Sequence, residues 1–131
     1  GHSVGNHTQH HVNGWKTSDE AYLKDVNDGR QRIDSDWFRP PYGRIRSSQV
    51  RLLKKQDASL KIVMWEVLSG DFDCSKTGEW CAKQVIGQAR PGSIVVFHDS
   101  EKGWERLQIC LPAVLENFNK LGYRFERLTG D

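Results

Sequence analysis

Two short apolar runs constrain the fold of this chain more than any other feature of its sequence. The runs KIVMWEVLS (61–69) and SIVVF (93–97) are almost unbroken in apolar residues, as is typical of parallel strands covered on both faces. An aromatic segment stopped by two prolines predicts a strand end near 37–38, and the alternating YRFERL predicts a last strand at 123–128. Apolar periodicity predicts helices at 17–35, 44–56, 80–89 and 104–121. This alternation predicts an α/β fold, either a parallel sheet or a barrel.

The ends of the predicted helices carry local signals. The candidate N-caps are Thr17 or Ser18, Ser47 or Ser48, and Asp73. Pro112 is expected to kink or split the last helix, and Gly122 is expected to end it.

Size and charge exclude several classes of protein. A length of 131 residues is usual for one domain, so we expect a single domain over residues 1–131. The formal net charge is only +2, with basic and acidic residues interleaved, which does not indicate a nucleic-acid partner. No apolar run approaches the roughly 20 residues that a transmembrane helix needs. The three cysteines lack metal-binding spacing, and we expect them to be buried or partly buried thiols.

Three polar segments directly follow the predicted strands. FRPPYG, LSGDFD and FHDS begin at residues 38, 68 and 97. Because the carboxyl ends of parallel strands meet at one edge, we expect these segments at one rim of the fold, where α/β proteins place their active sites.

The amino-terminal stretch GHSVGNHTQHH holds four of the five histidines of the chain. If this stretch opens a helix, His7 and His11 lie on one face and can bind one metal ion, while His10 points away. A His-rich segment also produces such a pair by chance. A hydrolytic zinc ion normally has three protein ligands, so another segment must supply the third. His98 is a candidate for that ligand or for a general acid.

Two of the polar segments contain further candidates. In FRPPYG the prolines fix the backbone, so the amide of Tyr42 can act as an oxyanion donor and Arg39 can orient a carboxylate; an incidental surface turn is the alternative. In LSGDFD, Asp71 can hydrogen-bond His98 and favour its charged form. Helix capping is the alternative role for this acidic segment, and Asp73 is better placed for it.

Taken in order, GHSVGNHTQHH, FRPPYG, WEVLSGDF and IVVFHDS resemble successive motifs of the polysaccharide deacetylase (NodB-homology) family. The resemblance implies a distorted (β/α) barrel that removes N- or O-acetyl groups from sugars such as chitin oligomers, peptidoglycan or xylan. It implies a divalent metal ion, with zinc as the expected metal, and an acetylated sugar or polysaccharide as the partner.

The family's metal and oxyanion roles carry over by position. The resemblance implies that His7 and His11 bind the metal ion, with Thr8 in the Ser/Thr place of the H-[ST]-x-x-H motif. It also implies that Arg39 steadies the catalytic base and that the Tyr42 amide helps to hold the oxyanion.

The acid and pocket positions follow in the later motifs. The resemblance implies that His98 is the catalytic acid and that Asp71 supports it. Val96 matches an apolar position that lines the acetate pocket. Phe72 stands where the family usually has Trp, which keeps an apolar wall of another shape, and Leu68 replaces a frequent Asp.

One family motif has no match in these residues. It is a Thr-Phe-Asp-Asp-Gly strand end that supplies the catalytic base and the third metal ligand. We therefore expect the C-terminal portion of the domain, a partial (β/α) barrel without its first strand–helix units. We expect this portion alone to be inactive and to bind metal weakly.

Two other functions are compatible with the same residues. One is a deacetylase-like protein that binds carbohydrate without hydrolysis, using stacking surfaces on Trp15, Trp37, Trp65, Trp80 and Trp104. The other is a metal hydrolase of another amide. The pair Asp71 and His98 favours an enzyme, since a binding protein needs no supported acid. A polymeric substrate would imply export or an envelope location, but the sequence itself indicates no compartment.

Overall fold

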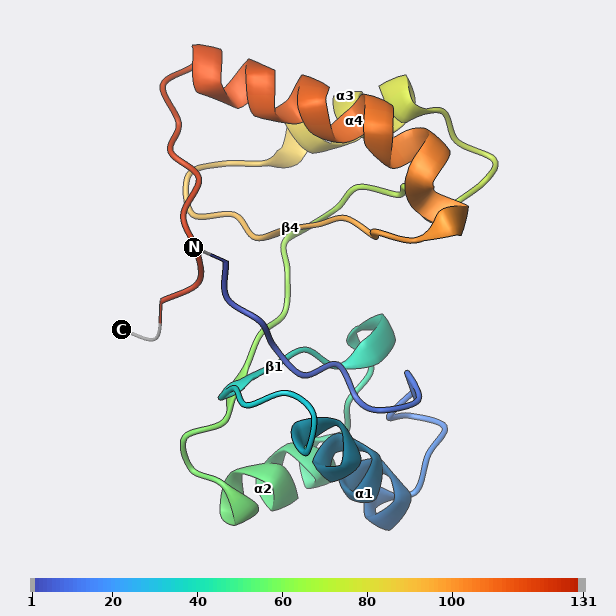
Figure 1. Cartoon of the computed structure of the whole chain (residues 1–131), viewed down its shortest axis with the longest axis vertical. Helices are drawn as coiled ribbons and strands as arrows, with labels where there is room; N and C mark the ends of the chain where they lie inside the picture. The colour runs from blue at the N-terminus through green and yellow to red at the C-terminus, as the bar shows by residue number, and fades with distance from the viewer. Residues whose placement is uncertain (1, 130–131) are drawn as a thin grey trace. The chain divides into compact units, whose positions relative to one another are not determined.

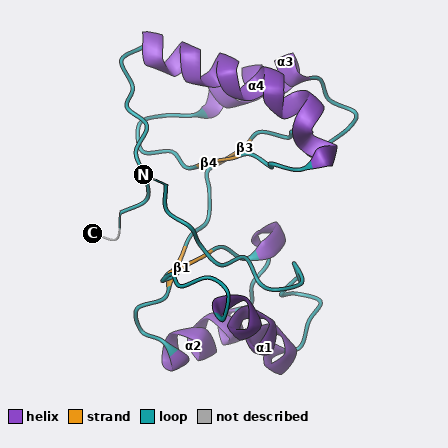
Figure 2. Cartoon of the chain, in the orientation of Figure 1, coloured by secondary structure: helices purple, strands orange, loops and turns teal. Residues whose placement is uncertain are grey.

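The computed structural model describes residues 2–129 and divides into two compact units (Figure 1). The first unit holds the chain up to Met64 together with the segment that begins at Arg127, and the second unit runs from Trp65 to Glu126. Helices and short parallel strands alternate in each unit (Figure 2). This arrangement confirms the α/β class, while closure into a barrel and the single-domain assignment stay predictions.

The described part of the first unit contains two helices, a two-stranded sheet and a 3₁₀ turn. In chain order these are α1 (Asp19–Arg30), β1 (Trp37–Phe38), η1 (Pro41–Gly43), α2 (Ser47–Gln56) and β2 (Lys61–Ile62). β1 and β2 are parallel, and Asn6 forms a further parallel bridge to Phe38. The core consists of Tyr22, Val26, Phe38, Leu53 and Leu60. Each of these large side chains stabilises the fold by about 1.5–3 kcal/mol when fully buried.

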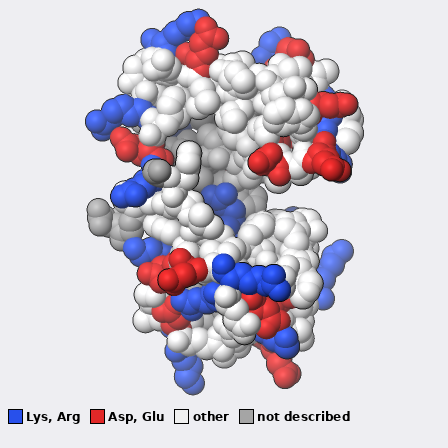
Figure 3. Space-filling model, viewed as in Figure 1, with Lys and Arg blue, Asp and Glu red and all other residues white. Residues whose placement is uncertain are grey.

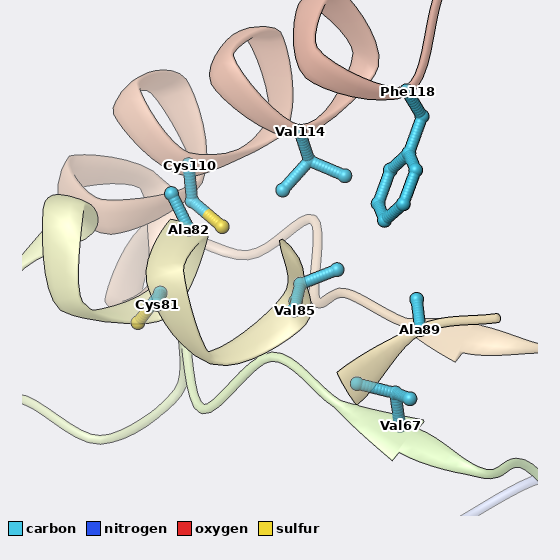
Figure 4. Close-up of a cluster of buried hydrophobic side chains, with 8 residues drawn as sticks. All are labelled: Val67, Cys81, Ala82, Val85, Ala89, Cys110, Val114 and Phe118. Carbon is cyan, nitrogen blue, oxygen red and sulfur yellow. The ribbon is translucent and has the colours of Figure 1, made fainter. Parts of the chain in front are cut away.

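The second unit repeats the pattern of parallel strands covered by helices. Its elements are β3 (Val67–Leu68), α3 (Gly78–Gln88), β4 (Val95–Val96) and α4 (Glu101–Lys120). β3 pairs with β4 in parallel, with Val67 opposite Val95. The core lies where α3 and α4 pack together over the sheet, and Val85, Val114 and Phe118 are among its members (Figure 4).

The predicted helices are present, but two of the predicted caps are wrong. Ser18 caps α1 as expected, and α1 ends earlier than predicted, at Arg30. The N-cap of α2 is Arg46, whose amide donates to the buried side chain of Gln49, so that no serine cap is needed. The N-cap of α3 is Thr77 rather than Asp73, because Thr77 directly precedes the first helical residue.

Two strand predictions are wrong, and the last helix is not split at Pro112, while a kink there stays a prediction. The run 61–69 forms two strands instead of one, since residues 63–66 leave the first sheet before β3 begins. The segment 123–128 is not a strand, and no described strand pairs with it. α4 continues through Pro112, which lies on its exposed face, where the unpaired carbonyl one turn earlier can reach water. Gly122 follows the helix in a left-handed conformation (φ +79°), as a terminating glycine should.

The surface mixes charges of both signs. On the face shown in Figure 3, Lys and Arg side chains alternate with Asp and Glu in both units. Cys81 and Cys110 are buried as predicted, but Cys74 is exposed because it lies in the loop before α3. Within residues 2–129, no helix combines the length and apolarity needed to cross a membrane.

Candidate functional site

A histidine–aspartate pair stands at the carboxyl ends of the two strands of the second unit. Asp71 follows β3 and His98 follows β4, so the parallel pairing of the strands brings these side chains together. Asp71 Oδ1 lies 2.7 Å from His98 Nδ1, and Asp71 Oδ2 accepts the backbone N–H of His98 at 2.6 Å. Asp71 is completely buried, whereas 40% of the His98 side chain is exposed. Because Nδ1 faces the carboxylate, Nε2 is the ring nitrogen that can reach a substrate.

This geometry suits a supported proton donor. Both oxygens of Asp71 hold the same residue, one through the ring and one through the backbone, so the imidazole orientation is fixed. The hydrogen bond expected between Asp71 and His98 is present, and the role of His98 as an acid stays a prediction.

Sequence reasoning missed two residues of α4 that contact this pair. Arg106 is buried, and its Nε donates to the backbone carbonyl of Asp71 at 2.7 Å. Gly103 lets the first turn of α4 approach His98, since a Cβ at this position would lie 2.6 Å from His98 O. A signal existed, because Gly103, Arg106 and Cys110 follow one another at helical spacing, which places an arginine in the buried stripe of the helix.

Phe72 and Val96 take different positions around the pair. The Phe72 ring stands edge-on to the His98 ring, with 5.1 Å between centroids, and 39% of Phe72 is exposed. Val96 is buried in β4, opposite Leu68. Asp73 accepts the backbone N–H of Ser75 at 2.9 Å, and hydrogen bonds from Ser75 lower the pKa of Asp73.

His7 and His11 are neighbours in the first unit. Their pairing was considered for a helical stretch, but this stretch is not a helix. The first helix begins only at Asp19, and Thr8 and His11 have positive φ angles of 62° and 54°. The two rings nevertheless meet edge-on, with 4.9 Å between centroids. A loop therefore brings the pair together.

The hydrogen bond of His7 favours a metal-binding tautomer. His7 Nδ1 lies 2.6 Å from the backbone carbonyl of Arg39, and a carbonyl can only accept, so Nδ1 carries the proton. In the neutral ring Nε2 then has the lone pair that binds a metal ion. His7 and His11 thus fit as two ligands, although residues 2–129 contain no group of three His, Cys, Asp or Glu side chains that could hold a metal.

His10 contacts Asp25 of α1, whereas its expected orientation was argued for a helix that this stretch does not form. Its Nδ1 lies 2.6 Å from Asp25 Oδ1, and its backbone N–H donates to Asp25 Oδ2 at 3.0 Å. Burial alone would raise the pKa of Asp25, but hydrogen bonds from His10 and Thr8 outweigh burial and lower it. His2 is exposed.

Tyr42 and Arg39 lie beside the histidine pair. Tyr42 has a positive φ of 58° within η1, and its ring centroid is 4.7 Å from that of His11. Left-handed backbone at a bulky residue is uncommon and concentrates at functional sites. Arg39 is half-buried, and burial lowers the pKa of its guanidinium. The structure adds a contact that the sequence did not suggest, from the Arg39 carbonyl to His7.

Trp15, Trp37 and Trp80 each carry a cation over one ring face. Arg44 lies 4.0 Å from the ring centroid of Trp15, Lys76 lies 4.7 Å from that of Trp80, and Lys61 lies 5.2 Å from that of Trp37. These cations leave less ring surface for a sugar, and stacking by the tryptophans stays a prediction.

Comparison with known proteins gives consistent matches. The family model for polysaccharide deacetylase matches residues 1–60. A peptidoglycan-N-acetylglucosamine deacetylase of Bacillus cereus is 31% identical over 95% of this chain and 61% of its own length. A chitooligosaccharide deacetylase of Azorhizobium caulinodans is 27% identical over 76% of this chain and 49% of its own length.

A solved structure agrees with these sequence matches. A crystal structure of a peptidoglycan N-acetylglucosamine deacetylase in complex with 4-naphthalen-1-yl-N-oxidanyl-benzamide superposes with a TM-score of 0.87 at 25% identity. The match covers 98% of this chain and 62% of that one. This chain therefore spans less than two thirds of the length of each of these relatives.

Proposed function

Because the chain belongs to the polysaccharide deacetylase family, we propose that the intact protein hydrolyses acetyl groups from a carbohydrate. The observation that carries the proposal is the pair formed by Asp71 and His98. A completely buried carboxylate that holds both the ring and the backbone of a part-exposed histidine is expected of a positioned general acid.

In this proposal the candidate site residues of the second unit have separate roles. Asp71 fixes the orientation of the His98 ring and leaves Nε2 toward the substrate. His98 gives a proton from Nε2 to the departing sugar amine or hydroxyl, so that the leaving group departs uncharged. Phe72 offers an apolar wall beside the imidazole, and Val96 is assigned to the acetate pocket.

We assign metal binding to the histidine pair of the first unit. His7 and His11 would hold a divalent metal, for which we propose zinc, and the tautomer of His7 supports this role. When bound, such a metal supplies Lewis-acid polarisation of the acetyl carbonyl and lowers the pKa of bound water. The Tyr42 amide donates to the oxyanion, and Arg39 orients a carboxylate. The third ligand and the catalytic base are assigned to no residue of this chain.

We propose an N-acetylated glucosamine polymer or oligomer as the substrate. The named relatives act on peptidoglycan N-acetylglucosamine and on chitooligosaccharide, which share this sugar. A proton donor beside the scissile bond suits an amide in particular, since an amine is a poor leaving group until it is protonated.

Acetate release tests the proposed function. The intact protein is incubated with peptidoglycan and with N-acetylglucosamine oligomers, and acetate is measured enzymatically. His98→Ala should reduce the rate by about 10²–10⁴-fold, the usual contribution of a general acid. His2→Ala is the matched control, because it removes an exposed histidine outside the pair, and it should retain the wild-type rate. Sugar binding without acetate release would instead favour a deacetylase-like protein that binds carbohydrate without hydrolysis. Acetate release from other amides alone would favour a metal hydrolase of another amide.

A further inference from the structure

We propose that Asp25 of α1 is a positioning residue that sets the loop carrying His7 and His11; this inference rests on the metal site of the proposed function. Asp25 accepts hydrogen bonds from two consecutive loop residues. Its backbone carbonyl accepts the N–H of Gln9 at 3.1 Å, and Oδ2 accepts the N–H of His10 at 3.0 Å. Oδ1 lies 2.6 Å from His10 Nδ1. One helical residue thus fixes the chain segment between the two metal-binding histidines.

The loop needs such anchoring because of its backbone conformation. Thr8 and His11 both have left-handed φ angles, of 62° and 54°, and neither is glycine. Side chains crowd the backbone in this region, so the conformation persists only where surrounding contacts hold it. The contacts of Asp25 lie between these two strained residues, at Gln9 and His10.

The other end of the loop is tied to the same turn of α1. The buried side chain of Asn6 accepts the N–H of Thr8 at 2.9 Å and donates to the carbonyl of Val26 at 2.8 Å. Gly29 leaves room for this side chain, since a Cβ there would lie 2.7 Å from Asn6 Oδ1. Neighbouring residues 25 and 26 therefore hold the loop at two places, in its middle and at its start.

Asp25 acts through the backbone of the loop rather than as a ligand. The contact between the His7 and His11 rings depends on the conformation at Thr8 and at His11 itself. Loss of Asp25 should therefore weaken metal binding without removing a ligand. Contacts that orient ligands from outside typically change metal affinity by about 10–100-fold.

Zinc affinity of the 131-residue chain tests the proposal. Zn²⁺ is titrated in competition with a chromophoric chelator at constant pH, and circular dichroism verifies folding of each variant. Asp25→Ala should weaken binding by about tenfold or more. Asp25→Asn should lose less, because its amide oxygen can still accept the N–H of His10. Asp28→Asn removes the same charge from the same helix, where Asp28 pairs with Lys24, and should bind within about twofold of wild type.

Two results would overturn the role of Asp25. One is wild-type affinity in Asp25→Ala. The other is an equal loss in Asp25→Asn and Asp28→Asn, which would show that charge alone matters. If Asp25→Ala does not fold, the comparison of Asp25→Asn with Asp28→Asn decides.

A wild-type chain that binds no zinc would count against the proposed metal site but would not test whether Asp25 positions the loop. In that case nuclear Overhauser contacts between the His7 and His11 rings test the role of Asp25. The contact should be lost in Asp25→Ala and kept in Asp28→Asn. Its persistence in Asp25→Ala would contradict positioning by Asp25.

Discussion

Replacement of Gly103 by alanine tests how closely α4 must approach the backbone of His98. An added Cβ would lie 2.6 Å from His98 O and 3.2 Å from Ser100 Oγ. Real Cβ contacts are essentially never shorter than 3.0 Å, so the backbone must shift by several tenths of an ångström. The carbonyl cannot turn aside easily, because the N–H of the same residue donates to the buried Asp71.

The expected magnitude follows from two opposing contributions. Overpacking by one methyl group costs about 1–3 kcal/mol, and alanine gains about 1 kcal/mol over glycine in a helix. Gly87→Ala is the matched control in α3 of the same unit, where the described residues place no atom within 4 Å of the added Cβ. Both variants have the helix gain, so Gly103→Ala should be about 1–3 kcal/mol less stable than Gly87→Ala.

Urea unfolding followed by circular dichroism measures this difference. Gly87→Ala should exceed the wild type in its free energy of unfolding by about 0.5–1 kcal/mol. Hydrogen exchange of the His98 amide should accelerate in Gly103→Ala, because the shift disturbs its bond to Asp71. The reasoning is refuted if Gly103→Ala is as stable as Gly87→Ala.

Three further predictions concern pH, packing and thiol chemistry. Hydrogen bonds from Ser59 and Arg30 lower the pKa of Asp57 from 3.8 to about 2. The ionised Asp57 therefore stabilises the fold above pH 4, and this stabilisation is lost as the pH falls towards 2. Between these pH values the melting temperature should fall less steeply in Asp57→Asn than in the wild type or in the exposed-site control Asp34→Asn. Phe118→Ala should destabilise by about 3–5 kcal/mol in urea unfolding, because this side chain is only 5% exposed in the core, whereas Leu121→Ala, at a position 65% exposed, should stay within about 0.5 kcal/mol of wild type. Iodoacetamide at pH 8 should label only Cys74 in the folded chain, because Cys74 is exposed and the other two cysteines are buried. Burial raises the pKa of Cys81, and it raises the pKa of Cys110 to about 12. Two or three labels per chain in mass spectrometry would contradict this prediction.

The second unit was largely predictable from the sequence. The run 93–97 identifies β4, and β3 lies at the end of the run 61–69, which was predicted as one strand. Parallel strands place the residues that follow them at a common edge. The contact between Asp71 and His98 follows from this rule together with the chemistry of a carboxylate and an imidazole. Arg106 was missed because an arginine on an amphipathic helix is usually solvated, and its bond to the Asp71 carbonyl joins residues 35 positions apart.

The first unit shows where local signals are insufficient. The histidine spacing was interpreted on the condition that the stretch opens a helix, but the stretch is a loop. Its positive φ angles occur at Thr8 and His11, residues that rarely adopt them. Its conformation depends on contacts with α1, which the local sequence does not encode. The same limit explains the cap of α2, because a serine was expected where Arg46 donates its amide to the buried Gln49.

Zinc binding by single-histidine variants tests most directly the division of roles between metal ligands and acid. The affinity of the chain for Zn²⁺ is measured for the wild type and for alanine variants at residues 7, 11 and 98. We expect His7→Ala and His11→Ala to lose binding. His98→Ala should keep the wild-type affinity, because His98 contacts Asp71 through Nδ1 and its proposed role is proton donation. Loss of zinc in His98→Ala, or its retention in His7→Ala, would contradict the assignment.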